Sequence, residues 1–169
     1  MRALRTMARP TSGHRYLQGT FTPQNPQKFI GGMNGSRVAT YRSSWELKLM
    51  ISFDTSDTFL RWGSENIICP YLSPIDKKEH RYYIDFYFEC KDATSGVVRK
   101  FWAECKPFAE TIPPKMPKAK TAKAMENYKI KAMTYIQNMA KWTAAKTLAS
   151  KQYNTQFIII NEKNMKSLN

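Results

Sequence analysis

Three side chains with complementary chemistry, Asp85, Glu104 and Lys106, fall within the segment HRYYIDFYFECKDATSGVVRKFWAECKP. Two runs of β-branched and aromatic residues flank the turn-prone residues 93–96, and this pattern predicts a hairpin of two antiparallel strands. If residues 93–96 form the loop, stepping outward in register brings Asp85 directly opposite Glu104, and strand alternation puts Lys106 on the same face. The hairpin would therefore gather two carboxylates and one amine.

Directly opposed carboxylates have Cβ atoms about 4.5–5.5 Å apart and repel each other unless a cation lies between them. Mg²⁺ suits such a pair when a main-chain carbonyl, here that of Cys105, and several water molecules complete its ligands. A bound ion acts as a Lewis acid on phosphate, and Lys106 beside it would handle the attacking water. The chemistry predicted for the trio is hydrolysis of a DNA phosphodiester. The plainer interpretation of a bare E-x-K run is a solvated charged stripe, and the opposed Asp85 is what argues against it.

A further carboxylate, Glu46, lies in the segment YRSSWELKLMISF, where Trp45, Leu49 and Phe53 recur every four residues. This spacing predicts a packed helix with Glu46 in its first turn. Residues 43–46 also spell the S-x-x-E capping box, in which Glu46 would only accept a hydrogen bond from the amide of Ser43. Both roles, metal-site acid and helix cap, stay open at this point.

An early-helix acid, the pair Ile84-Asp85 and the E-x-K run together resemble the PD-(D/E)XK nuclease superfamily, with Ile84 in place of the motif's proline. The resemblance implies an α/β fold with a restriction-endonuclease-like core, αβββαβ, in which helices flank a central mixed sheet. It implies metal-binding carboxylates at Asp85 and Glu104, a catalytic lysine at Lys106 and a helix-borne acid at Glu46. It also implies one or two Mg²⁺ ions, for which Mn²⁺ would substitute.

Five segments extend the resemblance to the head completion nucleases of T-even-type tailed phages over residues 41–162: YRSSWE, RWGSENIICPY, RYYIDFYF, AECKP and NMAKWTAAKTLA. That resemblance implies a metal-dependent endodeoxyribonuclease that trims or cuts double-stranded DNA at the head and neck, after genome packaging and before tail attachment. The implied partners are phage head, neck or portal proteins, with a homo-oligomer in the neck compatible with that role. The implied locations are the virion head and neck, and the host cytoplasm during assembly.

Two other functions fit the same residues. The chain could be a structural head-neck or portal-associated protein that binds DNA without essential cleavage. It could also be a transposase-type or repair endonuclease of the same fold, because the bare catalytic motif is equally compatible with those enzymes. Only the phage-like segments outside the motif favour head completion.

Composition supports one soluble, nucleic-acid-binding domain. The 169 residues are 42% hydrophobic, and 27 Lys and Arg against 13 Asp and Glu give a formal net charge of +14, which favours an anionic partner. A membrane is the weakest such partner, because no apolar run approaches a spanning length and no secretory signal is visible. The cysteines Cys69, Cys90 and Cys105 lack C-x-x-C spacing and are predicted to pack as small hydrophobes, without a zinc site.

The chain divides by composition into a basic flexible arm over 1–40, which contains no acidic side chain, a nuclease domain over 41–162 and a tail over 163–169. Within the domain, a strand is predicted near residues 66–72, ahead of the hairpin. Prolines between 107 and 117 predict a loop over the rim of the site.

Two helices and a last strand are predicted after that loop. The second helix would begin near Asn138 as its N-cap and bury Trp142. The apolar run QFIIIN is typical of a buried central strand.

Basic side chains outside the trio are candidates for phosphate contacts, although any single lysine is more often a solvated surface residue. In the superfamily the helix after the E-x-K strand often lends a polar residue to the active site, and the resemblance points to Lys141 for that role. The full predicted DNA-binding set is Lys118, Lys120, Lys123, Lys141, Lys146, Arg9 and Arg15.

Overall fold

Four strands form one mixed sheet at the centre of the chain. The computed structural model describes residues 17–92, 94–119 and 121–165. The strands, in their spatial order, are β3 (Phe59–Leu72), β4 (Glu79–Lys91), β5 (Val98–Cys105) and β6 (Thr155–Ile160). The first three are antiparallel neighbours, whereas β6 runs parallel to β5.

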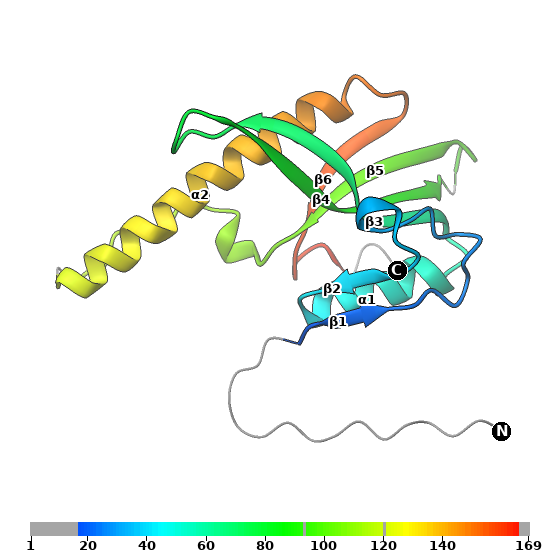
Figure 1. The fold of residues 1–169 in the computed structure, drawn as a ribbon, viewed down its shortest axis with the longest axis horizontal. Helices are drawn as coiled ribbons and strands as arrows, with labels where there is room; N and C mark the ends of the chain where they lie inside the picture. The colour runs from blue at the N-terminus through cyan, green and yellow to red at the C-terminus, as the bar shows by residue number, and fades with distance from the viewer. Residues whose placement is uncertain (1–16, 93, 120, 166–169) are drawn as a thin grey trace, which may run out of the picture.

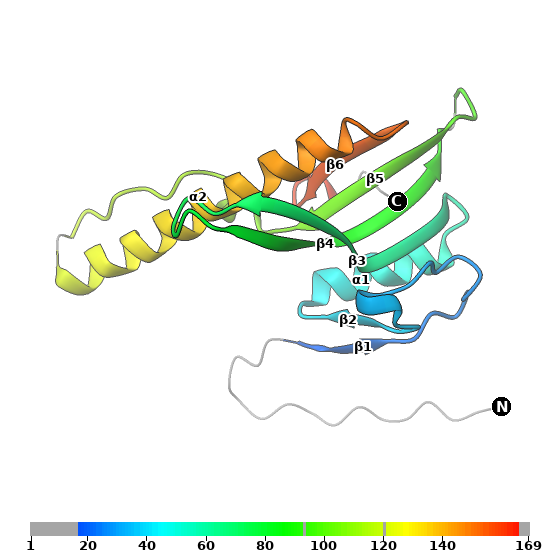
Figure 2. The ribbon, with the colours of Figure 1, turned by 45° about the horizontal axis from the view of Figure 1, so that its top comes forward.

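One helix covers each face of this sheet, as Figure 1 and Figure 2 show. Helix α1 (Ser44–Thr55) packs on one face and helix α2 (Ala122–Ala149) on the other. The order α1-β3-β4-β5-α2-β6 confirms the predicted αβββαβ core with a flanked mixed sheet. Among the described residues, no helix combines the length and apolar content needed to cross a membrane.

The hairpin of β4 and β5 has the predicted register. The amide of Asp92 donates to the carbonyl of Val97 at 2.9 Å, which closes the loop where the sequence predicts it. Phe86 pairs with Ala103 at the inner end of the ladder, so the next step in the same register sets Asp85 opposite Glu104. A tight connection and strict side-chain alternation were therefore sufficient to place these two carboxylates.

Strand β3 begins at Phe59, earlier than predicted, and carries a bulge opposite Asp85. Ser64 pairs with Phe86 and Ile67 with Ile84, so two residues of β3, Glu65 and Asn66, face one residue of β4. Glu65 adopts a φ of 50°, in the left-handed region that side chains other than glycine enter at a cost. A bulge bends its strand and increases the local twist, which re-aims side chains next to it.

Strand β4 changes its buried partners at this bulge. Beyond it, Phe86 and Phe88 pack on the α1 side, together with Phe53. Before it, Tyr82 and Ile84 belong to the cluster on the α2 side, although simple alternation would keep all four even-numbered residues on one face.

Helix α2 is one continuous helix, so the predicted start of a separate helix near Asn138 is wrong. Thr121 is the N-cap, accepting a hydrogen bond from the amide of Ala124, and the helix continues without a break to Ala149. Asn138 lies in its middle and is 7% exposed. Its side chain is buried and does not cap a helix end.

Strand β6 is an edge strand, which corrects the prediction of a central one. Among the described strands it pairs only with β5. Its run is wholly apolar because both faces are covered: Ile158 and Ile160 pack on the α1 side, and Phe157 and Ile159 on the α2 side.

Residues 17–40, which fall within the predicted basic arm, pack on the domain. Strands β1 (Gly19–Phe21) and β2 (Ala39–Tyr41) form a small antiparallel sheet. Between them, the backbone at Phe29 pairs with Trp62 of β3, and the two rings lie 4.5 Å apart. Residues 1–16 and 166–169 lie outside the described residues.

The fully buried carboxylate of Asp54 in α1 fastens this N-terminal layer. It accepts hydrogen bonds from the amide of Gln24 at 2.8 Å, from the amide of Asn25 at 3.2 Å and from the indole of Trp62 at 3.4 Å. A carboxylate with several N–H donors tolerates burial that an unpaired charge would not.

Replacing this carboxylate should destabilise the fold strongly. Asp54→Ala leaves two main-chain amides and an indole without their acceptor, so we expect the free energy of unfolding to fall by about 2–4 kcal/mol in urea titrations. Asp57→Ala, which removes an exposed carboxylate three residues away, should change it by less than about 0.5 kcal/mol. Equal effects of the two substitutions would contradict this anchoring role.

The bulge can be tested through the backbone strain at Glu65. Both Glu65→Gly and Glu65→Ala remove the carboxylate, but only glycine accepts a φ of 50° without a steric cost. In urea titrations, the free energy of unfolding of Glu65→Gly should therefore exceed that of Glu65→Ala by about 1 kcal/mol. An alanine variant as stable as the glycine variant would show that the left-handed conformation is not retained in solution.

Candidate active site

Asp85 and Glu104 meet at the end of the hairpin, inside the protein. The amide of Cys105 donates to Asp85 Oδ2 at 2.8 Å, and Glu104 is 4% exposed. Burial, followed by the charge of Glu104, raises the pKa of Asp85 well above its usual range. Without a cation nearby, the charge of Glu104 thus opposes the ionisation of Asp85.

Two donors hold Glu104 in place. The hydroxyl of Tyr82 donates to Glu104 Oε2 at 2.5 Å, and Lys106 Nζ lies 3.3 Å from Oε1. Burial and the Glu104 charge raise the pKa of Tyr82, so its proton stays available for this bond. Tyr82 was not predicted as a site residue, because alternation alone assigns it to the face opposite Asp85. The sequence does not mark the β3 bulge opposite Asp85, where the alternation of buried residues along β4 changes.

Lys106 is protonated in this arrangement. Burial alone would lower its pKa, but the charges of Glu104 and Asp85 outweigh burial and raise it. The ammonium group can therefore neutralise negative charge or hold a water molecule, whereas proton abstraction would require the carboxylates to be neutralised first.

Glu46 forms the capping box and also faces the trio. Its amide donates to Ser43 Oγ at 3.1 Å, while its carboxylate accepts from the Ser43 hydroxyl at 2.9 Å and from the amide of Arg42 at 2.8 Å. The capped amide is thus that of Arg42, not the predicted Ser43. Glu46 and Lys106 line one cavity of about 380 Å³, and the charge of Glu46 contributes to the raised pKa of Asp85.

An ion pair absent from the sequence prediction completes the surroundings of the trio. Arg42 Nη1 lies 2.7 Å from Glu65 Oε1, and Nη2 lies 3.3 Å from Oε2, a two-point contact. The hydrogen bond to Glu65 and the charges of Glu65, Glu46 and Asp85 raise the pKa of Arg42. No sequence pattern signals this pair, because it depends on the bulge that turns Glu65 toward α1.

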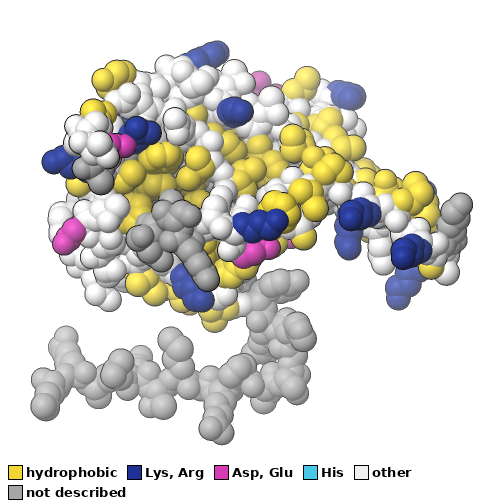
Figure 3. All heavy atoms as spheres, turned by 180° about the vertical axis from the view of Figure 1, so that it is seen from behind, with side chains coloured by type: hydrophobic (Ala, Val, Ile, Leu, Met, Phe, Trp, Pro, Cys, Tyr) yellow, Lys and Arg dark blue, Asp and Glu magenta, His cyan; other side chains and the backbone are white. Residues whose placement is uncertain are grey.

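The predicted DNA-binding residues are distributed unevenly around this site. Lys141 Nζ lies 5.8 Å from the ring centroids of Tyr71 and Tyr82, so Tyr82 connects it to Glu104. Lys146 is exposed in the last turn of α2, Lys123 lies in the first turn, and Lys118 precedes the helix. The first half of α2 projects beyond the sheet, and Figure 3 shows basic side chains along this projection. Lys120, Arg9 and Arg15 lie outside the described residues.

A PD-(D/E)XK site implies a divalent metal, and the donor set here fits one. No described residue donates a hydrogen bond to Asp85 Oδ1, which leaves that oxygen available as a ligand. In the described part of the chain, no three His, Cys, Asp or Glu side chains form a ready-made metal cluster. An ion would therefore depend on Asp85, Glu104, the Cys105 carbonyl and water. The Cys105 thiol is unsuited to the task, because burial raises its pKa to about 12.

Two comparisons with known proteins identify the family of this chain. The family described as TnsA-like endonuclease N terminal matches residues 56–162, which include Asp85, Glu104 and Lys106. The head completion nuclease of Enterobacteria phage T4 is 32% identical over 150 residues, which cover 89% of this chain and 94% of that protein. The chain therefore belongs to the TnsA-like endonuclease family and has a restriction-endonuclease-like fold.

Proposed function

We propose that this chain is a Mg²⁺-dependent endodeoxyribonuclease that hydrolyses phosphodiesters of double-stranded DNA. The observation that carries the proposal is the buried pair Asp85 and Glu104 on facing strands, with Lys106 Nζ 3.3 Å from Glu104. Family membership supports nucleolytic chemistry, and a net charge of +14 suits a polyanionic substrate.

Each residue of the site has a distinct task in this reaction. A bound divalent ion supplies Lewis-acid charge at the phosphate. Asp85 and Glu104, with the Cys105 carbonyl, would hold it, and Tyr82 fixes the orientation of Glu104. Lys106 places an ammonium group in the adjoining cavity, where it positions water and stabilises negative charge that develops on the phosphate.

The name of the T4 relative supports placing this activity in phage head completion. The enzyme would trim or cut DNA at the head and neck after packaging and before tail attachment. It would then meet head, neck or portal proteins in the host cytoplasm and could remain in the virion, with several copies in the neck.

The first experiment is a cleavage assay on linear and supercoiled DNA. We expect cleavage with Mg²⁺ and none with EDTA, and a loss of at least about 100-fold in Glu104→Gln, which keeps an acceptor for Tyr82 but removes the charge. Glu79→Gln, at the exposed start of β4, is the matched control and should retain activity.

Each contrary result has a definite meaning. Equal cleavage by wild type and Glu104→Gln would indicate a contaminating nuclease and overturn the site assignment. Wild-type binding without cleavage would overturn the enzymatic proposal in favour of a structural DNA-contacting role.

The two roles of Glu46 can be separated because glutamine can still accept the cap hydrogen bond. Glu46→Gln should change the free energy of unfolding by less than about 0.5 kcal/mol but lower kcat by about 10-fold or more. Ser43→Ala removes the cap but keeps the Glu46 carboxylate, so it should lower the free energy of unfolding by about 1 kcal/mol and leave kcat nearly unchanged. Near-normal kcat in a stable Glu46→Gln variant would reduce Glu46 to a helix cap.

A further inference from the structure

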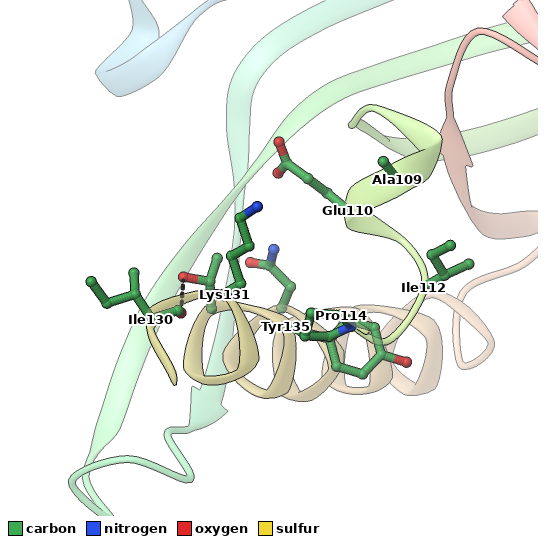
Figure 4. Close-up of a pocket in the computed structure, with 9 residues that line it drawn as sticks. Ala109, Glu110, Ile112, Pro114, Ile130, Lys131 and Tyr135 are labelled. Carbon is green, nitrogen blue, oxygen red and sulfur yellow. Dashed lines mark hydrogen bonds between the residues drawn. The ribbon is translucent and has the colours of Figure 1, made fainter. Parts of the chain in front are cut away.

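A second cavity, of about 400 Å³, lies next to the candidate active site and has no part in the proposed hydrolysis. It is enclosed by the proline-rich loop after β5 and by α2. Figure 4 shows this arrangement, with Glu110 and Pro114 on the loop and Lys131 and Tyr135 on the helix. A volume of this order is within the range of small-molecule sites and is large enough for a nucleobase.

The cavity forms where α2 leaves the sheet. Trp142, Ala145 and Ala149 pack against the sheet and recur at helical spacing. The same stripe continues toward the N-terminus as Asn138, Tyr135 and Lys131, which line the cavity. The described residues that face these three across the cavity belong to the loop: Ala109, Glu110, Ile112 and Pro114.

Asn138 is the feature that points to a ligand. The residue is 7% exposed and lines the cavity, and no hydrogen bond joins its side-chain amide to another described residue. The atoms of this amide are not sealed inside the protein, so the amide is open to the cavity. An amide at a cavity wall without a protein partner is available to a ligand, which would replace the water that otherwise bonds to it. The neighbouring Thr134 does not explain it, because its hydroxyl donates to the carbonyl of Ile130 at 3.0 Å.

The walls of the cavity indicate which ligand would satisfy Asn138. Tyr135 offers an aromatic face, and Ile112, Ile130 and Pro114 add apolar surface, a combination suited to a flat heterocycle. Glu110 makes the interior unfavourable for phosphate but can accept a hydrogen bond from an exocyclic amino group. Phosphate contacts are available just outside, because the described lysines of 115–131 outnumber the acids there: Lys115, Lys118, Lys123, Lys129 and Lys131 against Glu126.

Position relative to the active site decides between a base and other flat ligands. Glu110 lines both this cavity and the cavity that contains Glu46 and Lys106. Its charge also acts on Lys106. A DNA strand with a phosphate at Lys106 would therefore pass the mouth of the second cavity within its neighbouring nucleotides.

We infer that this cavity binds an unpaired nucleobase of the DNA strand beside the scissile phosphate, with Tyr135 stacking on the base and Asn138 hydrogen-bonding its edge. The inference rests on the proposed nuclease function and adds a preference for DNA that is frayed, bulged or mismatched at the cut. Taking a base out of a duplex costs free energy, and the cost is least where pairing is already lost.

Binding measurements test this preference separately from cleavage. Affinity would be measured by anisotropy for a duplex with a one-nucleotide bulge and for the same duplex fully paired. Ca²⁺ would replace Mg²⁺, and gels would verify that the DNA stays intact. A 2-aminopurine at the bulge would report stacking. We expect wild type to bind the bulged duplex at least about 10-fold more tightly, with quenching of the 2-aminopurine.

Two variants assign the preference to the cavity. Asn138→Leu and Tyr135→Leu should reduce the preference to less than about twofold, without changing affinity for paired DNA. Asn127→Leu makes the same replacement at an exposed position on α2 and should behave as wild type. Asn138→Leu should also unfold at about the same urea concentration, because the amide that it removes bonds to no other described residue; a purely structural asparagine would give a less stable variant.

The outcomes distinguish this inference from the proposed function. Bulge preference that requires Asn138 and Tyr135, without Mg²⁺-dependent cleavage, would support the base site and overturn the hydrolysis. Cleavage with no bulge preference, or with a preference that survives both substitutions, would support the nuclease and overturn the base site. If the cavity instead binds a side chain of a partner protein, neither variant will change the affinity for either DNA, and that result also overturns the base site.

Discussion

The opposition of Asp85 and Glu104 is the constraint on which the rest of the site depends. Two charges about 5 Å apart repel by about 3 kcal/mol at an effective dielectric constant near 20, and burial adds to the cost. The hairpin offers no escape, because a shift in register would turn every side chain of β5 to the wrong face. The surrounding contacts, from the Cys105 amide, the Tyr82 hydroxyl and Lys106, all compensate this one pair.

What the sequence predicted correctly was local. The loop at 93–96 and strict alternation set the hairpin register, and the capping box at Ser43 set the start of α1. Both depend on residues close together in the chain, whose preferences act before any tertiary contact forms. The element order followed from the same local signals, aided by resemblance to a known superfamily.

What the sequence could not predict depends on contacts between distant residues. No glycine marks the bulge at Glu65. The positions of Tyr82 and of the Arg42–Glu65 ion pair beside the site both depend on this bulge. Asparagine is common at helix N-caps, but a buried asparagine also fits the interior of a helix, as Asn138 does. Its residue type alone therefore led to the wrong prediction that a helix begins there. The run QFIIIN is apolar because helices cover both faces, which is true of edge strands as well as central ones.

Acidic side chains outnumber basic ones around the site. Four carboxylates, Glu46, Glu65, Asp85 and Glu104, surround two cations, Arg42 and Lys106, within the described site. Glu65 is balanced by Arg42, which leaves three acids against one lysine. Protonation of Asp85 relieves only part of this excess, and it would remove the very group that a metal needs. A bound divalent cation would balance the remaining two charges, and the pKa of Lys106, which these acids raise, would then fall. The surplus of carboxylates thus keeps Lys106 a cation, the form that can hold a water molecule or neutralise negative charge.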